Sequence, residues 1–134
     1  KKKDISALES VQNNFTRKLI LRTHRLHYSE ILSGLYRNEI FGLRSLTYRR
    51  KRNDLLMTYK ILKRFVDLDA NDFFRIVPVV TRGMPFRIST ATPKSQIRSK
   101  FFVCRVSTSF NKILPCNFFP SKYSLFRRRV KEFL

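Results

Sequence analysis

Apolar residues recur every three or four positions in five stretches of the chain, which is the period of an amphipathic α-helix. These stretches are residues 4–21, 28–37 and 45–65, a fourth from residue 99 to Pro115, and a fifth that follows Pro120. Each stretch has one apolar stripe that must pack against another element. The pattern therefore predicts a mainly α fold, in the form of a small bundle of four to five amphipathic helices.

The first stretch has a stripe that is expected to face the core. It consists of Ile5, Leu8, Val11, Phe15 and Leu19. Ser6 and Glu9 have the spacing of a capping box at the start of this helix. Ser29 is a candidate cap for the second stretch, and Gly42 is expected to end the segment that follows it.

The middle of the chain, around residues 76–95, is expected to be irregular and partly extended because its prolines exclude a long helix. Short strands are expected at 79–80, at 86–88 or at both, with a turn at 81–83. The acidic cluster at 67–72 lacks the spacing of a calcium loop and predicts a helix-capping turn.

The whole chain, residues 1–134, is expected to form a single segment. Within it, a helical part covers about 4–74, an irregular linker about 75–98, and C-terminal helices about 99–134. The chain begins with Lys1 and not with Met, which indicates a piece of a longer protein.

The charge of the chain points to a class of partner. Its 29 Lys and Arg residues against 9 Asp and Glu residues give a formal net charge of +20, which attracts polyanions. No stretch approaches about 18 apolar residues, and no signal peptide is present, so neither a membrane partner nor secretion is expected. Two cysteines, Cys104 and Cys116, are too few for a disulfide framework and indicate free thiols in a reducing compartment.

Candidate catalytic chemistry is missing from the sequence. There is no phosphate-binding glycine loop, and no adjacent pair of aspartates that would hold polymerase magnesium ions. The two histidines, His24 and His27, have no further ligands at metal spacing apart from Glu30. Catalytic residues, metal ligands and cofactors are therefore not expected.

Basic residues instead gather in four patches on or beside the expected helices, where they can converge on a phosphate backbone. Tyr48, Phe101 and Tyr123 are interleaved with them and are either core residues or stacking surfaces for bases. The candidate phosphate contacts are Arg17, Lys18, Arg49, Arg50, Lys51, Arg52, Lys100, Arg127, Arg128 and Arg129.

Four of these candidates are consecutive, and four consecutive helical residues span about 300° of the helix surface. At least one of them, expected to be Arg52, must therefore run its stem along the apolar edge of its helix or meet a carboxylate. Asp54 follows Arg50 by four residues, which predicts a local salt bridge between them.

The order of short motifs resembles the region that follows the polymerase core of non-LTR (LINE-type, jockey/CR1-like) retrotransposon reverse transcriptases. Residues 8–17, LESVQNNFTR, resemble the family's LExVQRRFTR, and residues 42–50, GLRSLTYRR, resemble GLxSLEYRR. Residues 52–62 carry RNDL and YKIL, which resemble RGDLxxxYKIL. Smaller matches follow in the same order at 28–30, 81–83, 101–106, 111–115 and 124–127.

The sequence also departs from the family pattern. Phe110 stands where the family has Trp before Asn in WNxLP, one extra residue separates Asn111 from Leu114, and residues 35–41 resemble an insertion. These differences indicate a diverged or decaying copy.

The resemblance implies a non-catalytic C-terminal part of an RNA-directed DNA polymerase. It implies RNA or DNA as ligand, the polymerase core of the same polyprotein as partner, and a nuclear or cytoplasmic setting. An alternative is a structural segment that packs on the polymerase core without contacting nucleic acid. Adsorption to an anionic membrane is a weaker alternative.

Overall fold

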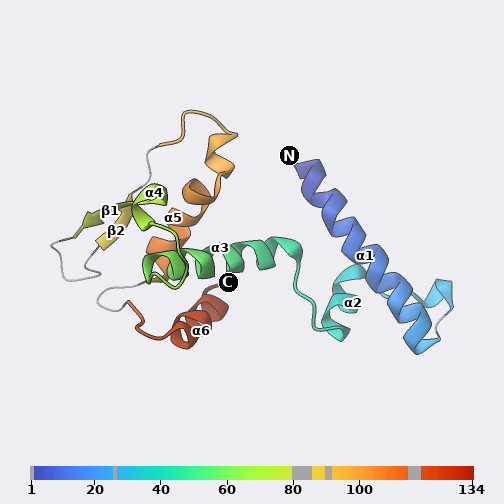
Figure 1. The fold of residues 1–134 in the computed structure, drawn as a ribbon. Helices are drawn as coiled ribbons and strands as arrows, with labels where there is room; N and C mark the ends of the chain where they lie inside the picture. The colour runs from blue at the N-terminus through green and yellow to red at the C-terminus, as the bar shows by residue number, and fades with distance from the viewer. Residues whose placement is uncertain (1, 26, 80–85, 90–91, 115–118) are drawn as a thin grey trace. The chain divides into compact units, whose positions relative to one another are not determined.

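A computed structural model describes residues 2–25, 27–79, 86–89, 92–114 and 119–134 (Figure 1). Of these residues, 66% are helical, in six α-helices and two short 3₁₀ helices beside one small two-stranded sheet, so the prediction of a mainly α fold is confirmed. The chain divides into two compact units, Lys1–Arg50 (unit 1) and Lys51–Leu134 (unit 2). None of the described helices is both long and apolar enough to cross a bilayer.

Unit 1 begins with the long helix α1, Lys2–His24, followed by a short 3₁₀ helix, Tyr28–Glu30, and by α2, Gly34–Ile40. The prediction of one helix over 28–37, capped by Ser29, is wrong. The chain is extended at Ile31, and Ser33 caps α2 by accepting a hydrogen bond from the Tyr36 N–H. Gly42 has a φ of +61° directly after α2, so its predicted role as a helix terminator is confirmed.

The face of α1 that packs within unit 1 is mainly polar. Thr16 and Ile20 are fully buried, and the Gln12 side-chain amide donates to Asn38 and to the Arg44 carbonyl. The capping box predicted for Ser6 and Glu9 is wrong, because α1 starts before both residues and the Glu9 carboxylate accepts the Thr47 N–H at 3.2 Å instead.

The apolar stripe of α1 faces solvent. Leu8, Val11 and Phe15 are 52%, 65% and 60% exposed, and Ile5 is exposed as well. The expectation that this stripe faces a core is therefore wrong for the described chain, since the α1–α2 contact is made by hydrogen bonds on the neighbouring face.

Helix α3, Leu46–Leu62, confirms the helix predicted over 45–65. Its N-terminus is capped by the Ser45 hydroxyl, which accepts the Tyr48 N–H at 3.1 Å. It ends just before Arg64, whose φ of +54° is incompatible with a continuing α-helix. Its first five residues belong to unit 1 and the remainder to unit 2.

Unit 2 continues with α4, β1, β2, a 3₁₀ turn, α5 and α6 (Figure 1). Asp69 caps α4 by accepting the Asn71 N–H at 2.9 Å, which confirms the predicted capping turn. Helices α5 and α6 confirm the last two predicted helices. The bounds are Ala70–Phe73 for α4, Arg75–Pro78 for β1, Phe86–Ser89 for β2, Arg98–Lys100 for the turn, Phe102–Ile113 for α5 and Tyr123–Phe133 for α6.

Strands β1 and β2 pair antiparallel, with Ile76 opposite Ile88. The strand predicted at 86–88 is confirmed, whereas the other strand ends at Pro78 and does not include Val79. The Asn111 side chain of α5 donates to the Ile88 carbonyl at 2.9 Å and accepts the Ile88 N–H at 3.1 Å, which ties the sheet to α5. Val80, the predicted turn at 81–83, Pro115 and Cys116 lie outside the described residues.

The core of unit 2 is built around Tyr59 of α3, which has no exposed surface. Its ring stacks on Phe126 with centroids 4.5 Å apart and contacts Phe119 and Tyr123 at 5.3 and 6.0 Å. Its hydroxyl donates to the Pro120 and Ser121 carbonyls, and burial raises the pKa of the phenol above its ordinary value. Tyr59 thereby joins the end of α3 to the start of α6.

Candidate nucleic-acid interface

Helix α6 carries a basic face that points away from the core of unit 2. Phe126 and Val130 are buried, whereas Arg127, Arg128 and Lys131 are exposed and share the opposite side of the helix. The only acidic residue in α6 is Glu132, whose carboxylate lies 3.9 Å from Arg128, and both side chains are exposed. Such a pair contributes little and leaves the face strongly cationic.

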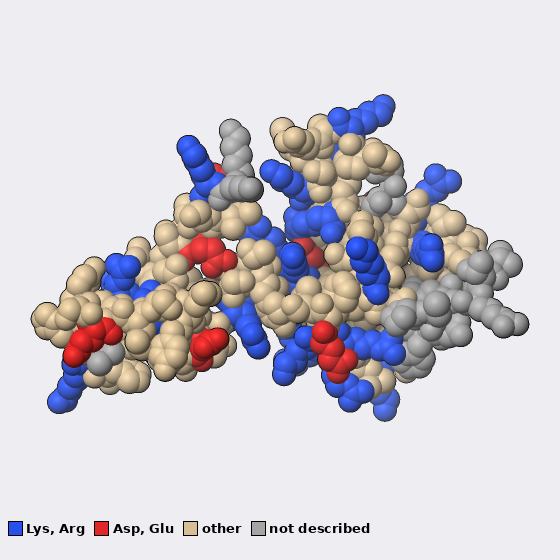
Figure 2. Space-filling model, turned by 180° about the vertical axis from the view of Figure 1, so that it is seen from behind, with Lys and Arg blue, Asp and Glu red and all other residues tan. Residues whose placement is uncertain are grey.

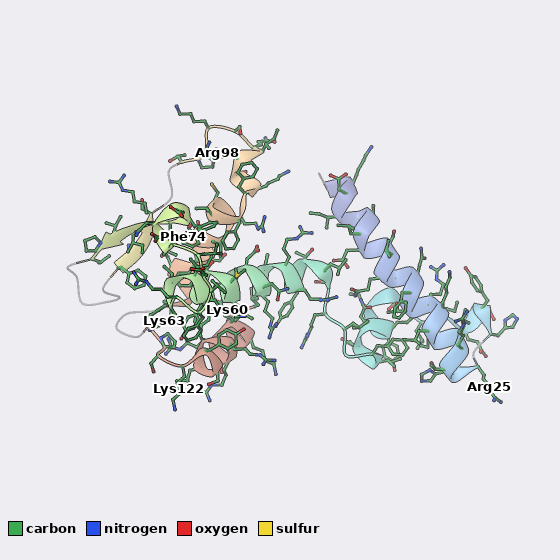
Figure 3. The ribbon with its side chains drawn as sticks, in the orientation of Figure 1. Arg25, Lys60, Lys63, Phe74, Arg98 and Lys122 are labelled. Atoms are coloured by element: carbon green, nitrogen blue, oxygen red, sulfur yellow. The ribbon has the colours of Figure 1, made fainter. Side chains whose placement is uncertain are left out.

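Three lysines surround the N-terminal end of this face (Figure 3). The Lys60 ammonium lies 5.3 Å from the centre of the Tyr123 ring, and the Lys63 ammonium lies 4.5 Å from the centre of the Phe119 ring. Lys122 is exposed and immediately precedes α6. The two rings flank Tyr59, so the aromatic core residues position the lysines at one end of the unit.

Lys60 links the lysines to the α6 face through Tyr123. Tyr123, Arg127 and Lys131 follow each other at intervals of four residues, or about 6 Å along the helix. Because Lys60 lies over Tyr123, it extends the row formed by Arg127 and Lys131. We call the whole set the α6 surface, and it consists of Lys60, Lys63, Lys122, Arg127, Arg128 and Lys131.

The predicted run at 49–52 does not form one surface. Arg49, Arg50 and Lys51 are exposed on different sides of α3, and Arg52 is half-buried, as the snorkelling prediction requires. Arg49 and Arg50 belong to unit 1, whereas Lys51 belongs to unit 2.

Asp54 pairs with Arg105 of α5, and the predicted salt bridge with Arg50 is wrong. The two side chains form a bidentate pair, with Nε–Oδ2 at 2.6 Å and Nη2–Oδ1 at 2.9 Å. This hydrogen bonding raises the pKa of the Arg105 guanidinium above its ordinary value. Arg105 also donates to the Lys100 carbonyl at 2.8 Å, so the pair fixes the 3₁₀ turn that carries Lys100.

The other predicted contacts are dispersed. Lys18 and Lys100 are exposed on separate units, and Arg17 is half-buried with a hydrogen bond of 3.4 Å to the Tyr28 hydroxyl. Arg129 is half-buried, and its Nη1 atom is inaccessible to solvent. Of the ten predicted candidates, only Arg127 and Arg128 therefore contribute to the α6 surface.

Two of the three aromatic candidates have a cation over the ring. Lys60 lies over Tyr123, and the Arg44 guanidinium lies 5.6 Å from the centre of the Tyr48 ring. Phe101 is exposed next to Lys100 and is the one whose ring is free to stack on a base.

Sequence reasoning missed these three lysines because Lys60 and Lys122 have no charged neighbour in the sequence and Lys63 has only Arg64 beside it. The available signal was the spacing of Lys60 and Lys63, which places them one turn apart at the end of a helix. Their convergence with Lys122 depends on the packing of α6 against Tyr59, which is not visible in the sequence.

Positive charge dominates both units. Unit 1 holds 11 basic against 4 acidic residues and unit 2 holds 18 against 5, which gives net charges of +7 and +13. Figure 2 shows Lys and Arg side chains spread over one face of the molecule, with few carboxylates between them. Within the described residues, no group of three or more His, Cys, Asp or Glu side chains is arranged to hold a metal ion.

No protein-family model, curated protein or solved structure matches the chain.

Proposed function

We propose that the chain binds the sugar-phosphate backbone of RNA or DNA through the α6 surface and performs no catalysis itself. The observation that carries the proposal is the gathering of six basic side chains from α3, the residue after it, α6 and the residue before α6, with Glu132 as the single carboxylate in α6. Such a surface recognises phosphates by charge and does not read base sequence.

The resemblance to the C-terminal region of a non-LTR retrotransposon reverse transcriptase belongs to the same proposal. In its favour, residues of separate matched motifs make structural contacts with each other: Glu9 with Thr47, and Asp54 with Arg105. On this proposal the parent protein is an RNA-directed DNA polymerase in the nucleus or cytoplasm, and its polymerase core is the second partner.

The test is the salt dependence of binding to a short single- or double-stranded oligonucleotide. Six phosphate contacts give a slope of log K against log salt near −5 for duplex DNA, and about −4 for a single strand. Replacing Arg127 and Lys131 with Gln removes two contacts and lowers the magnitude of the slope by about 2 for duplex DNA.

The matched control replaces Arg75 and Lys112 with Gln. Both are exposed residues of unit 2 outside the α6 surface, and the change in net charge is identical. The control is expected to keep the slope of the wild type. The proposal that the α6 surface binds the phosphates would be refuted by an equal decrease of the slope in the two double variants. It would also be refuted by binding that does not respond to salt between about 50 and 200 mM.

A second candidate function is that of a packing segment for the polymerase core, and the exposed apolar stripe of α1 favours it. Apolar faces of this kind are typical of docking sites. On this alternative, replacing Val11 and Phe15 with Gln abolishes binding to the core and leaves the salt slope unchanged. The experiment is a pull-down of the full chain with the polymerase core, beside the oligonucleotide titration.

A further inference from the structure

Unit 1 contains a cavity of about 400 Å³ that is largely open to solvent, between α1, the 3₁₀ helix and the start of α2. Two arginines line it, Arg17 from α1 and Arg37 from α2, together with the side chains of Tyr28 and Ser33. No Asp or Glu lies among the described residues that line the cavity. It is therefore cationic and rich in hydrogen-bond donors.

Arg37 is a buried charge with neutral partners. Its side chain is only 4% exposed, and it donates to the Thr16 hydroxyl, the Leu32 carbonyl and the Asn13 carbonyl. A guanidinium has five N–H donors, so two remain after these three bonds. Removing a charge from water is costly unless an opposite charge compensates it, and no carboxylate is bonded to Arg37 in the described part of the chain.

Arg17 brings a second positive charge to the same cavity. It follows Asn13 by four residues on α1, and both residues line the cavity. The guanidinium donates to the Tyr28 hydroxyl at 3.4 Å. Because this hydroxyl oxygen accepts from Arg17, its own hydrogen is available to another acceptor.

Ser33 supplies a further donor in the same way. Its Oγ accepts the Tyr36 N–H at 3.4 Å, which leaves the hydroxyl hydrogen to be donated. The cavity thus offers N–H and O–H groups from four side chains, and a ligand with several acceptor oxygens and about two negative charges complements it.

We propose that this cavity binds a phosphate monoester group, held by Arg37, Arg17 and the hydroxyls of Tyr28 and Ser33. A phosphate monoester carries a charge of about −1.5 to −2 at neutral pH, which matches two guanidiniums better than a carboxylate or a phosphodiester does. The volume exceeds that of a bare phosphate, so the group can belong to a small phosphate ester or to the phosphorylated end of a nucleic acid. The proposal does not depend on the α6 surface, which lies in the other unit.

The experiment titrates the full chain with inorganic phosphate and with a nucleoside 5′-monophosphate, followed by calorimetry at constant ionic strength. Arg17→Gln is expected to weaken binding about tenfold, the order expected for loss of one charge-assisted hydrogen bond. Arg22→Gln is the matched control, because it removes the same charge from an exposed position of α1 outside the cavity. Arg22→Gln is expected to bind like the wild type.

Tyr28→Phe keeps the ring and the charge of the site and removes one donor, so it is expected to weaken binding by a smaller factor than Arg17→Gln. It also keeps the test decisive if Arg17→Gln perturbs the fold. Equal weakening by Arg17→Gln and Arg22→Gln, or no saturable binding up to about 10 mM, ten times the Kd of a millimolar site, overturns the proposal.

A second arm distinguishes the two sources of the phosphate group. A preference for a 5′-phosphorylated oligonucleotide over its 5′-hydroxyl form, lost in Arg17→Gln, assigns the site to a nucleic-acid end. Equal affinity for the two oligonucleotides, with retained binding of the nucleoside monophosphate, assigns it to a small phosphate ester. If the proposed role of the α6 surface is wrong, the salt slope of oligonucleotide binding differs from the expected value. The preference for the 5′-phosphorylated oligonucleotide is unaffected, so the two proposals fail separately.

Discussion

Single polar residues hold distant parts of unit 2 together. Asp54 binds Arg105 across 51 positions of sequence, Tyr59 binds the carbonyl of Pro120, and Asn111 binds the backbone of β2. The sequence motifs that contain these residues therefore act in folding, and the motifs at 52–62 also carry Arg52 and Lys60, which are basic candidates. The partner of Asp54 was predicted wrongly because the only pairs visible in a sequence are local ones, such as Arg50 four residues away.

Asp54→Asn is expected to lower the free energy of unfolding of unit 2 by about 1–2 kcal/mol, since it leaves the Arg105 guanidinium without its charged acceptor. Urea denaturation measures the change. Arg50→Gln is the control and is expected to stay within about 0.5 kcal/mol of the wild type. A larger loss in Arg50→Gln than in Asp54→Asn contradicts the observed pairing.

At the scale of elements, hydrophobic periodicity predicted the helices well and their partners poorly. The helices over 45–65, 99–115 and after Pro120 were found because each buries its apolar stripe. Helix α1 was also found, but its buried face is the polar one beside the stripe. Periodicity shows where the apolar stripe of a helix lies, but it does not show which face of the helix a neighbouring element covers. In unit 1, α2 is attached to α1 by hydrogen bonds on the polar face.

Substitutions on α1 separate the two faces. Replacing Val11 and Phe15 with Gln is expected to change the free energy of unfolding by no more than about 0.5 kcal/mol, because both residues are exposed and Gln favours helix. Ile20→Ala, on the buried face, is expected to cost about 2–5 kcal/mol. Chemical denaturation followed by circular dichroism compares them. A loss in the double variant as large as that in Ile20→Ala would show that the stripe is covered in the isolated chain.

At the scale of the molecule, the sequence predicted a single segment over residues 1–134 and not the division into two units. The boundary between Arg50 and Lys51 lies inside helix α3, where the sequence pattern is uninterrupted. It arises because the start of α3 is capped from unit 1 by Glu9 and Ser45, whereas the buried residues of α3 pack in unit 2. Neither contact can be read from the periodicity of the helix itself.

Separate cores imply separate responses to mutation. Phe126→Ala removes a ring that stacks on Tyr59 and is expected to cost about 3–5 kcal/mol, with loss of amide protection in α5 and α6. Amides of α1 are expected to keep their wild-type exchange rates. Native-state hydrogen exchange on the full chain measures both. Uniform loss of protection across α1, α5 and α6 would show one cooperative unit.

The contact of Asn111 with Ile88 has a consequence for self-association. A two-stranded sheet has two open edges, and open edges are templates for pairing with further chains. The carboxamide of Asn111 occupies the outward N–H and C=O of Ile88, so it replaces a third strand at the middle of β2. On the other edge, β1 begins with Arg75 and ends with Pro78, a charge and a residue without an N–H. The two strands are therefore protected against fibril-type strand addition on both sides. On the β2 side the protection comes from one side-chain amide, and its hydrolysis to a carboxylate would remove the donor to the Ile88 carbonyl.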